Sequence, residues 1–293
     1  MNIRRLFSRP VKIVSLLASV ALVALGLTAC QPQPHSVLVV GDGTRVALSQ
    51  TSVLAGIDSF AVTSNNKTGG SSEITLFRLN PGATTSRVAI DLSEEFSQTP
   101  ATAAKGTRDT THDITSFGLA DVSFGTSVTV TANLTPGTYY LMDLGNYQGA
   151  PGGPALTTLK VLPGGSRGPL HGSVSVQATG ADRFVAPASW PHQGSVVLAN
   201  TDPNSIHFMD LQRVKPGTTD AQVQAYFDSN SQNPPPFIIP GPEAGVDIVS
   251  PAVTVRMAYN LPAGTYVLLC FVADDQTGMP HALMGMHQVV TLT

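Results

Sequence analysis

Residues 261–293 read LPAGTYVLLCFVADDQTGMPHALMGMHQVVTLT, and their pattern predicts two β-strands, 265–272 and 286–292, joined by a loop. Both segments are rich in β-branched and other apolar residues, and turn-forming glycine and proline lie between them. Similar short runs recur along the whole chain, which contains 27 Gly and 22 Pro residues but only 12% charged residues. This composition predicts an all-β protein whose short strands pack as Greek-key β-sandwiches.

The same stretch gathers side chains that bind soft metal ions. Cys270, His281, Met284 and Met286, which offer a thiol, an imidazole and two thioethers, lie within 17 positions of one another. Copper binds thiolate, imidazole and thioether ligands, so these residues predict a copper site. The alternative is that Cys270 is only a buried thiol and that the methionines fill gaps in the core.

The first 29 residues have the pattern of a signal peptide. Four basic residues precede an apolar run, residues 13–27, that is too short for a comfortable membrane span. The run ends in Leu-Thr-Ala-Cys, which resembles the lipobox of bacterial lipoproteins. This resemblance implies cleavage before Cys30 and lipidation of Cys30, with residues 30–35 forming the lipidated end and a spacer. An ordinary signal peptide or an uncleaved anchor is the alternative.

Lipidation at Cys30 predicts where the protein works. Several acyl chains would hold it on a membrane almost permanently. We therefore expect it in the bacterial cell envelope, on the outer face of the cytoplasmic membrane or in the periplasm or outer membrane of a didermic cell. The membrane, contacted through the lipid, is its first expected partner.

Removal of the signal peptide changes the charge and the thiol count. The mature chain retains 12 basic and 19 acidic residues, a net charge of −7, which argues against nucleic-acid binding. Because lipid occupies Cys30, Cys270 is the only remaining thiol and no disulfide can form within the chain. An unpaired thiol outside the cytoplasm is either buried and inert or held by a metal ion.

The motifs of residues 36–162 recur in residues 172–293 in the same order, at offsets of 127 to 137 residues. The matching pairs are 36–40 with 173–177, 77–82 with 212–217, and 134–139 with 261–266. These matches predict a tandem duplication, with two β-sandwich domains joined by a glycine- and proline-containing linker at residues 163–171.

Each copy is expected to contain one short helix. Threonine residues can cap a helix over residues 84–96 in the first copy and over residues 218–227 in the second. Residues 99–118 and 233–242 are expected to be long irregular loops, which usually cover something or are disordered.

Several motifs of the second copy follow one another in an order typical of a known family. They are Asn200 shortly before His207, Val-Lys-Pro-Gly at residues 214–217, Gly-Thr-Tyr at 264–266, Cys270, Pro-His at 280–281 and Gly-Met at 285–286. This pattern resembles the cupredoxin-like domains of the plastocyanin and azurin type. In that family, one His follows an early strand, while a Cys, a second His and usually a Met come from the last two strands and their loop.

The resemblance implies a type 1 (blue) copper centre in the second copy. Its ligands would be His207, Cys270, His281 and Met286, with Met284 as an alternative axial ligand. The fold it implies is a pair of cupredoxin-like sandwiches. A rigid site with two imidazoles, one thiolate and a weak axial thioether suits a copper ion that alternates between two oxidation states.

The first copy lacks this ligand set. Aligned on the shared motifs, Asp143 stands in the place of Cys270 and Ser72 in the place of His207, and no His or Met occurs in residues 149–156. We therefore expect the first copy to be a degenerate cupredoxin-like domain, with a structural role or a role as an interaction platform.

The sequence also bears on enzymatic activity. No His-X-His pair occurs, no His flanks Cys270, and the Gly-X-Ser-X-Gly motif of hydrolases is absent, so we expect no enzyme. Two classes remain, a lipid-anchored copper protein that carries electrons or holds copper, and a non-metal surface module that binds protein or glycan. In the first class, an exposed edge of His281 ringed by Met279, Ala282 and Leu283 would form an apolar docking patch for a redox partner protein.

Overall fold

The computed structural model describes residues 36–67 and 70–293. The expected signal peptide, Cys30 and the spacer that follows it lie outside the described residues. Within the described part of the chain, no helix is both long enough and apolar enough to cross a membrane.

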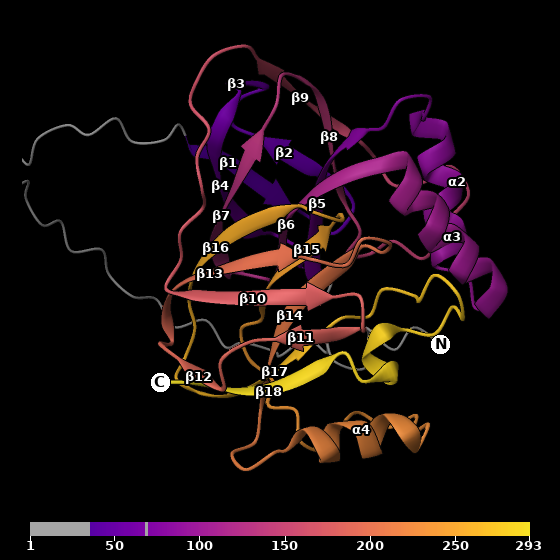
Figure 1. The fold of residues 1–293 in the computed structure, drawn as a ribbon, viewed down its shortest axis with the longest axis vertical. Coiled ribbons are helices and arrows are strands. Elements are labelled where there is room, and N and C mark those ends of the chain that lie inside the picture. Colours follow the sequence, from indigo (N-terminus) through magenta and orange to yellow (C-terminus); the bar gives the residue numbers. More distant parts are fainter. Residues whose placement is uncertain (1–35, 68–69) are drawn as a thin grey trace, which may run out of the picture.

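The described strands form two sheets (Figure 1). The first sheet contains β1 (Ser36–Gly41), β2 (Val46–Leu48), β4 (Gly56–Ser64), β7 (Ser127–Leu134), β10 (Val174–Thr179), β11 (Arg183–Val185), β13 (Gln193–Asn200) and β16 (Thr254–Asn260). The second sheet contains β3 (Ser52–Leu54), β5 (Ser71–Leu79), β6 (Ile114–Ser123), β8 (Gly137–Asp143), β9 (Thr157–Leu162), β12 (Ser189–Trp190), β14 (His207–Val214), β15 (Ala244–Val249), β17 (Gly264–Leu269) and β18 (His287–Leu292). The all-β prediction is confirmed.

The two halves of the chain repeat one strand order. In the first sheet the order from the centre outward is β7-β4-β1-β2 in one half and β16-β13-β10-β11 in the other. In the second sheet it is β6-β5-β8-β9-β3 and β15-β14-β17-β18-β12. The halves meet strand to strand, because β7 pairs antiparallel with β16 and β6 pairs antiparallel with β15. Both sheets therefore continue from one half into the other, and the domain boundaries taken from the sequence stay a prediction.

The core lies between the sheets and follows from alternation along the strands. In β1, Val37 and Val39 are fully buried while Leu38 is exposed, and β10 repeats the pattern with Val174 and Val176. Burial of one such side chain stabilises the folded state by about 1.5–3 kcal/mol relative to leaving it exposed to water.

The repeated Gly-Thr-Tyr motif begins equivalent strands. Gly137 and Gly264, with φ of 155° and 154°, occupy a backbone region that other residues rarely adopt. The hydroxyl of buried Tyr139 accepts a hydrogen bond from the Thr135 amide at 3.0 Å. The hydroxyl of buried Tyr266 donates to the Pro262 carbonyl at 2.8 Å. In both halves a tyrosine thus ties the core to the turn before its own strand.

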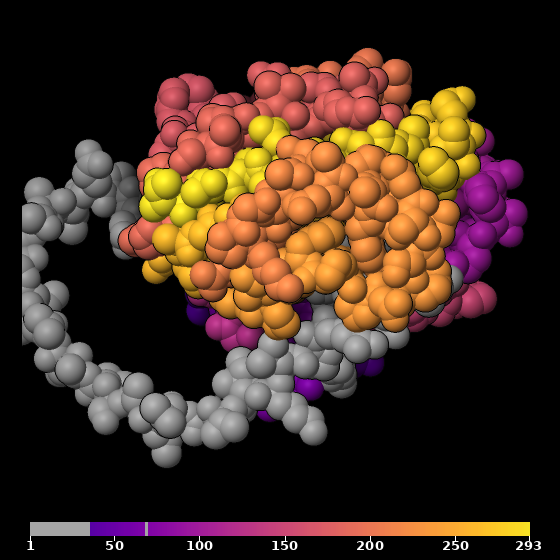
Figure 2. All heavy atoms as spheres, turned by 90° about the horizontal axis from the view of Figure 1, so that it is seen from below, coloured from indigo at the N-terminus to yellow at the C-terminus, as the bar shows by residue number. Residues whose placement is uncertain are grey.

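Two helices begin where threonine caps were expected. Helix α2 (Thr85–Glu95) starts after Thr84, whose side chain accepts a hydrogen bond from the Arg87 amide. Helix α4 (Asp220–Asp228) starts after Thr219, which forms a capping box with Gln222. The face shown in Figure 2 is formed largely by the orange segment that contains α4.

The expectation of an irregular loop over residues 99–118 is wrong. Helix α3 (Pro100–Asp113) and the start of β6 occupy this segment, so the first half has two helices rather than one. Proline in the first helical turn is a start signal, whereas the many threonines that follow have low helix propensity and gave no apolar stripe. Packing against α2 stabilises α3, and Gly106 permits it because a Cβ there would clash with the backbone of Glu95.

Candidate metal centre

His207 is the first residue of β14 and is fully buried. The preceding segment is held by Asn200, whose side-chain amide donates to the carbonyls of Ser205 and Val249, both at 2.8 Å. The pairing of β14 with β15 changes register between His207 and Met209. This irregularity and the Asn200 clamp fix the direction in which the imidazole points.

Cys270 follows β17 rather than lying inside it. The strand ends at Leu269, so the expected strand over residues 265–272 is three residues too long. The carbonyl of Cys270 instead accepts a hydrogen bond from Ala282 at 2.6 Å, and the carbonyl of Val272 accepts one from His281 at 2.9 Å. The main chain therefore leaves β17 to pair with the segment that carries the second imidazole.

His281 opens a short 3₁₀ helix, η1 (His281–Met284), where the sequence indicated only a loop. Gly285, with φ of 102°, ends this turn, and the Met286 amide donates to the His281 carbonyl at 2.9 Å. The turn brings His281 back towards Cys270 and places Met286 directly before β18.

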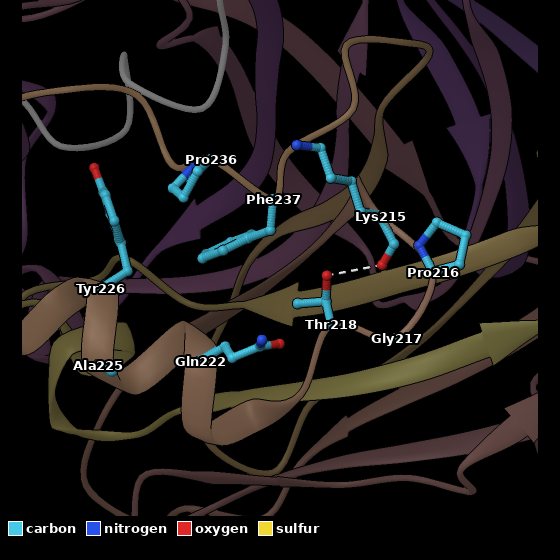
Figure 3. A pocket seen from close by; sticks show the side chains of 9 residues that line it. All are labelled: Lys215, Pro216, Gly217, Thr218, Gln222, Ala225, Tyr226, Pro236 and Phe237. Carbon is cyan, nitrogen blue, oxygen red and sulfur yellow. Dashed lines mark hydrogen bonds between the residues drawn. The ribbon is translucent and has the colours of Figure 1, made fainter.

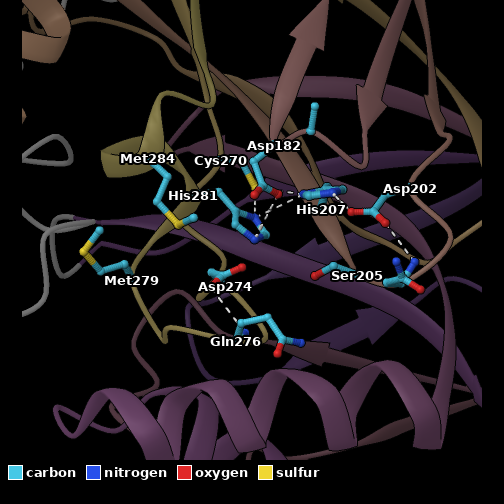
Figure 4. A network of polar contacts seen from close by, with 12 residues as sticks. Asp182, Asp202, Ser205, His207, Cys270, Asp274, Gln276, Met279, His281 and Met284 are labelled. Carbon is cyan, nitrogen blue, oxygen red and sulfur yellow. Dashed lines mark hydrogen bonds and ion pairs between the residues drawn. The ribbon is translucent and has the colours of Figure 1, made fainter.

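Three of the predicted donor atoms converge (Figure 4). Sγ of Cys270 lies 3.6 Å from Nδ1 of His281 and 3.8 Å from Nδ1 of His207, and the two Nδ1 atoms are 3.2 Å apart. All three residues are fully buried. Donors bound to one ion at roughly 2.0–2.3 Å lie roughly 3–4 Å from one another, so the three atoms fit a single metal ion.

The two candidate axial methionines differ in their surroundings. Met286 is fully buried, whereas Met284 is partly exposed. Sδ of Met284 accepts a contact from the Thr277 hydroxyl at 3.8 Å. Burial therefore favours Met286 over Met284 as the fourth donor.

Carboxylates lie behind both imidazoles, and the sequence gave no signal for them. Nε2 of His207 is 3.0 Å from Oδ2 of Asp202, and Nε2 of His281 is 3.6 Å from Oδ1 of Asp182. At His207, Asp202 accepts the Nε2 proton and so leaves the Nδ1 lone pair for a metal ion. The acids come from other loops, so only the fold brings them to the histidines.

The protonation of the site without metal follows from its contacts. Burial raises the pKa of the Cys270 thiol, but hydrogen bonds and charge from His207 and His281 outweigh it, and the pKa falls from 9.0 to about 5. Burial lowers the pKa of His207, but Asp202 and Cys270 outweigh it and raise the pKa to about 9. At neutral pH the metal-free site therefore contains a thiolate, the form that binds metal ions.

The corresponding place in the first half holds a carboxylate instead. Asp143 is almost fully buried and accepts hydrogen bonds from the amides of Gly43, Glu73 and Gly145 at 2.7, 3.1 and 3.0 Å. Ser72, in the position of His207, pairs its hydroxyl with Ser64 at 2.9 Å. Hydrogen bonds from backbone amides thus satisfy the carboxylate of Asp143. These two positions carry neither a thiol nor an imidazole.

The surroundings of His281 differ from the expected docking patch. His281 and Ala282 are fully buried, Leu283 is partly buried, and Met279 alone of the expected ring is strongly exposed, at 44%. The loop does not present an imidazole edge to solvent. Elsewhere, a cavity of about 520 Å³ lies between α4 and residues 236–237, and none of the predicted ligands lines it (Figure 3).

No protein-family model matches the chain, and no curated protein sequence is significantly similar to it. Solved structures that are similar to it include dithionite-reduced auracyanin from Roseiflexus castenholzii, with 18% identity over 41% of this chain and 94% of that chain and a TM-score of 0.26. Copper nitrite reductase from Nitrosomonas europaea has 10% identity over 89% of this chain and 94% of that chain, with a TM-score of 0.24. A multicopper oxidase has 9% identity over 92% and 93%, with a TM-score of 0.23.

These similar structures bear on two predictions, the absence of enzymatic activity and the fold. The nitrite reductase and the multicopper oxidase are themselves enzymes, so the prediction that this chain is not an enzyme is withdrawn. That prediction relied on ligands adjacent in sequence, whereas donors from distant segments, such as those assembled here, escape such a search. At this level of identity the likenesses concern the fold alone, and the chain's own strands form a β-sandwich of two sheets.

Proposed function

We propose that the chain binds one copper ion through Nδ1 of His207, Sγ of Cys270 and Nδ1 of His281, with Met286 as a weak fourth donor. The observation that carries the proposal is the convergence of these three buried atoms within 3.8 Å of one another. A thiolate, two imidazoles and a thioether favour copper over the harder divalent ions.

We propose electron transfer as the use of this ion, and storage of copper as the second candidate. Bound copper would supply one-electron chemistry. The protein would hold its donors still, because Asp202 anchors His207 and main-chain hydrogen bonds join residues 270 and 272 to η1. Such rigidity reduces the rearrangement of the ligands that accompanies a change of oxidation state. It therefore favours electron transfer over copper storage.

A copper titration of metal-free protein tests the proposal. The expected result is uptake of one equivalent of Cu(II), with a thiolate-to-copper absorption at about 600 nm that Cys270→Ser abolishes. Met284→Leu is the matched control and retains the absorption. Protein that stays colourless and takes up neither Cu(I) nor Cu(II) would instead support the alternative of a non-metal β-sandwich that binds protein or glycan.

We also propose that the protein is exported and anchored by lipid at Cys30, where a redox partner protein would meet it. The support is the pattern of residues 1–30 alone. Cys30→Ser should move the protein from the membrane fraction to the soluble fraction, and mass spectrometry of the membrane-bound form should find acyl chains at its amino terminus. Unchanged membrane association of the variant would point to an uncleaved anchor.

A tandem duplication is the simplest origin of the repeated motifs and strand order. In this proposal residues 36–162 form the copy that lost the ligand set, and residues 172–293 form the copy that kept it. The first copy would then act as a structural partner, because its sheets extend those of the second.

A further inference from the structure

A polar cavity of about 730 Å³ lies beside the candidate metal centre, on the side of the imidazole rings that faces away from Cys270. Residues from both halves of the chain line it. The second half contributes Asp182, Asp202, Asp274 and Asp275, and α3 of the first half contributes Arg108 and His112.

The cavity carries an excess of negative charge. Two of its carboxylates are fixed by the backbone, since Asp202 accepts a hydrogen bond from the Asn204 amide at 2.8 Å and Asp274 accepts one from the Gln276 amide at 3.2 Å. Arg108 is the facing cation, and its guanidinium donates to the main-chain carbonyl of Asp275. The four carboxylates outnumber the guanidinium and the His207 imidazole that contacts Asp202, so the cavity attracts cations.

A buried nitrogen without a partner points towards these acids. Among the described residues, Nε2 of His281 has no hydrogen-bond partner, although His281 is fully buried. This atom is 3.6 Å from Asp182, and ligand atoms of Asp182, Asp274 and His281 lie within 4.8 Å of one another. A buried nitrogen without a hydrogen bond lowers the stability of the fold, so its position beside two acids indicates that it binds a ligand or has a function.

The two histidines are held unequally. His207 is fixed from behind, with Nε2 at 3.0 Å from Asp202, whereas Nε2 of His281 has no such bond. Turning the His281 ring therefore breaks no hydrogen bond at Nε2. His281 is the ring that can move aside at the smaller cost.

We propose that this acidic vestibule, defined by Asp182, Asp202, Asp274 and Asp275, collects hydrated copper ions and is the route by which they reach Cys270. The inference rests on the proposed copper function. It answers a physical problem, because His207, Cys270 and His281 are fully buried and an ion from solvent needs a path to them. As the ion binds, any proton on Sγ or on the two Nδ1 atoms leaves to solvent, and no electron is transferred.

The first half of the chain, which lacks the ligand set, contributes to the vestibule. Helix α3 forms one wall of it, and Gly278 in the ligand loop packs against the carbonyl of Pro100 at the start of α3. Arg108 holds the same loop at Asp275. The first half thus shapes the access route to a site that only the second half supplies with donors.

The rate of copper uptake tests the vestibule separately from the site. Metal-free protein is mixed with one equivalent of Cu(II), and the growth of the absorption at about 600 nm is followed by stopped flow at low and high ionic strength. The test variants are Asp275→Asn and the charge reversal Asp275→Lys, because the side chain of Asp275 lines the cavity and contacts none of the proposed ligands. The control is Asp228→Asn, which removes the same charge from an exposed position on α4.

The expected result is an uptake rate about three- to tenfold lower in Asp275→Asn and lower still in Asp275→Lys, with a weaker salt dependence and an unchanged final absorption. The control should match the wild type. Variants that take up copper as fast as the wild type contradict the proposed role of the vestibule but not the proposed copper site. A loss of final absorption at an unchanged rate also overturns it, because the acids would then hold copper rather than admit it. Wild-type protein that takes up no copper refutes the proposed function itself.

Discussion

Oδ2 of Asp202 lies 3.0 Å from Nε2 of His207, and both side chains are buried, so a carboxylate fixes the side of the imidazole that faces away from Cys270. The contact orients Nδ1 towards the sulfur and raises the electron density of the ring. The same contact is looser at His281, where the distance to Asp182 is 3.6 Å. The two imidazoles of one site are therefore held with different stiffness.

Asp202→Asn should weaken Cu(II) binding by about 10- to 100-fold, because a neutral amide stabilises the donating imidazole less well than a carboxylate. The loss of a buried negative charge should also raise the reduction potential of the bound copper. Competition with a chelator and a redox titration measure the two effects. Asp228→Asn should change neither, and an equal effect in that control would mean that net charge, not the contact with His207, is responsible.

The thiol of Cys270 should titrate far below its ordinary pKa in metal-free protein. Its pKa is lowered from 9.0 to about 5, so the thiolate is present above about pH 5 and is lost as the pH falls through that value. The stability that the thiolate contributes is fully present above about pH 9 and is lost progressively as the pH falls from there to about 5. Ultraviolet difference absorption against Cys270→Ala follows the thiolate, and a midpoint near 9 would show that the imidazoles do not stabilise it.

Met286→Leu and Met284→Leu separate the two axial candidates. Loss of the buried thioether of Met286 should raise the reduction potential and shift the copper absorption, since a weak axial donor tunes both. Met284→Leu should leave the spectrum unchanged. The reverse outcome would assign the axial position to Met284.

Gly106→Ala should destabilise the packing of α3 on α2 by about 1–3 kcal/mol, because the added Cβ would clash with the backbone of Glu95. Urea unfolding measures the change. Gly241→Ala is the matched control, since a Cβ there meets nothing within 4 Å. Equal stability of the two variants would show that the helices can separate without cost.

The strand and turn plan could be read from the sequence because it depends on local patterns. The apolar pattern of residues 261–293 predicted β17 and β18, and threonine caps predicted the starts of α2 and α4. The threonine-rich sequence of α3 was misjudged because that helix depends on contact with α2, which no local pattern records.

For the candidate site, the sequence by itself determined which residue types were available. One thiol, together with His281 and two methionines close to it in the sequence, indicated a site for a soft metal ion. The family resemblance named His207 as a further ligand, and the tertiary structure places this residue, 63 positions before Cys270, beside the thiol. Only the tertiary structure showed that Asp182, Asp202 and Asp274 lie behind the imidazole rings. Donor chemistry is a property of single side chains, whereas convergence, burial and the charge of a cavity are properties of segments that meet only when the sheets have formed.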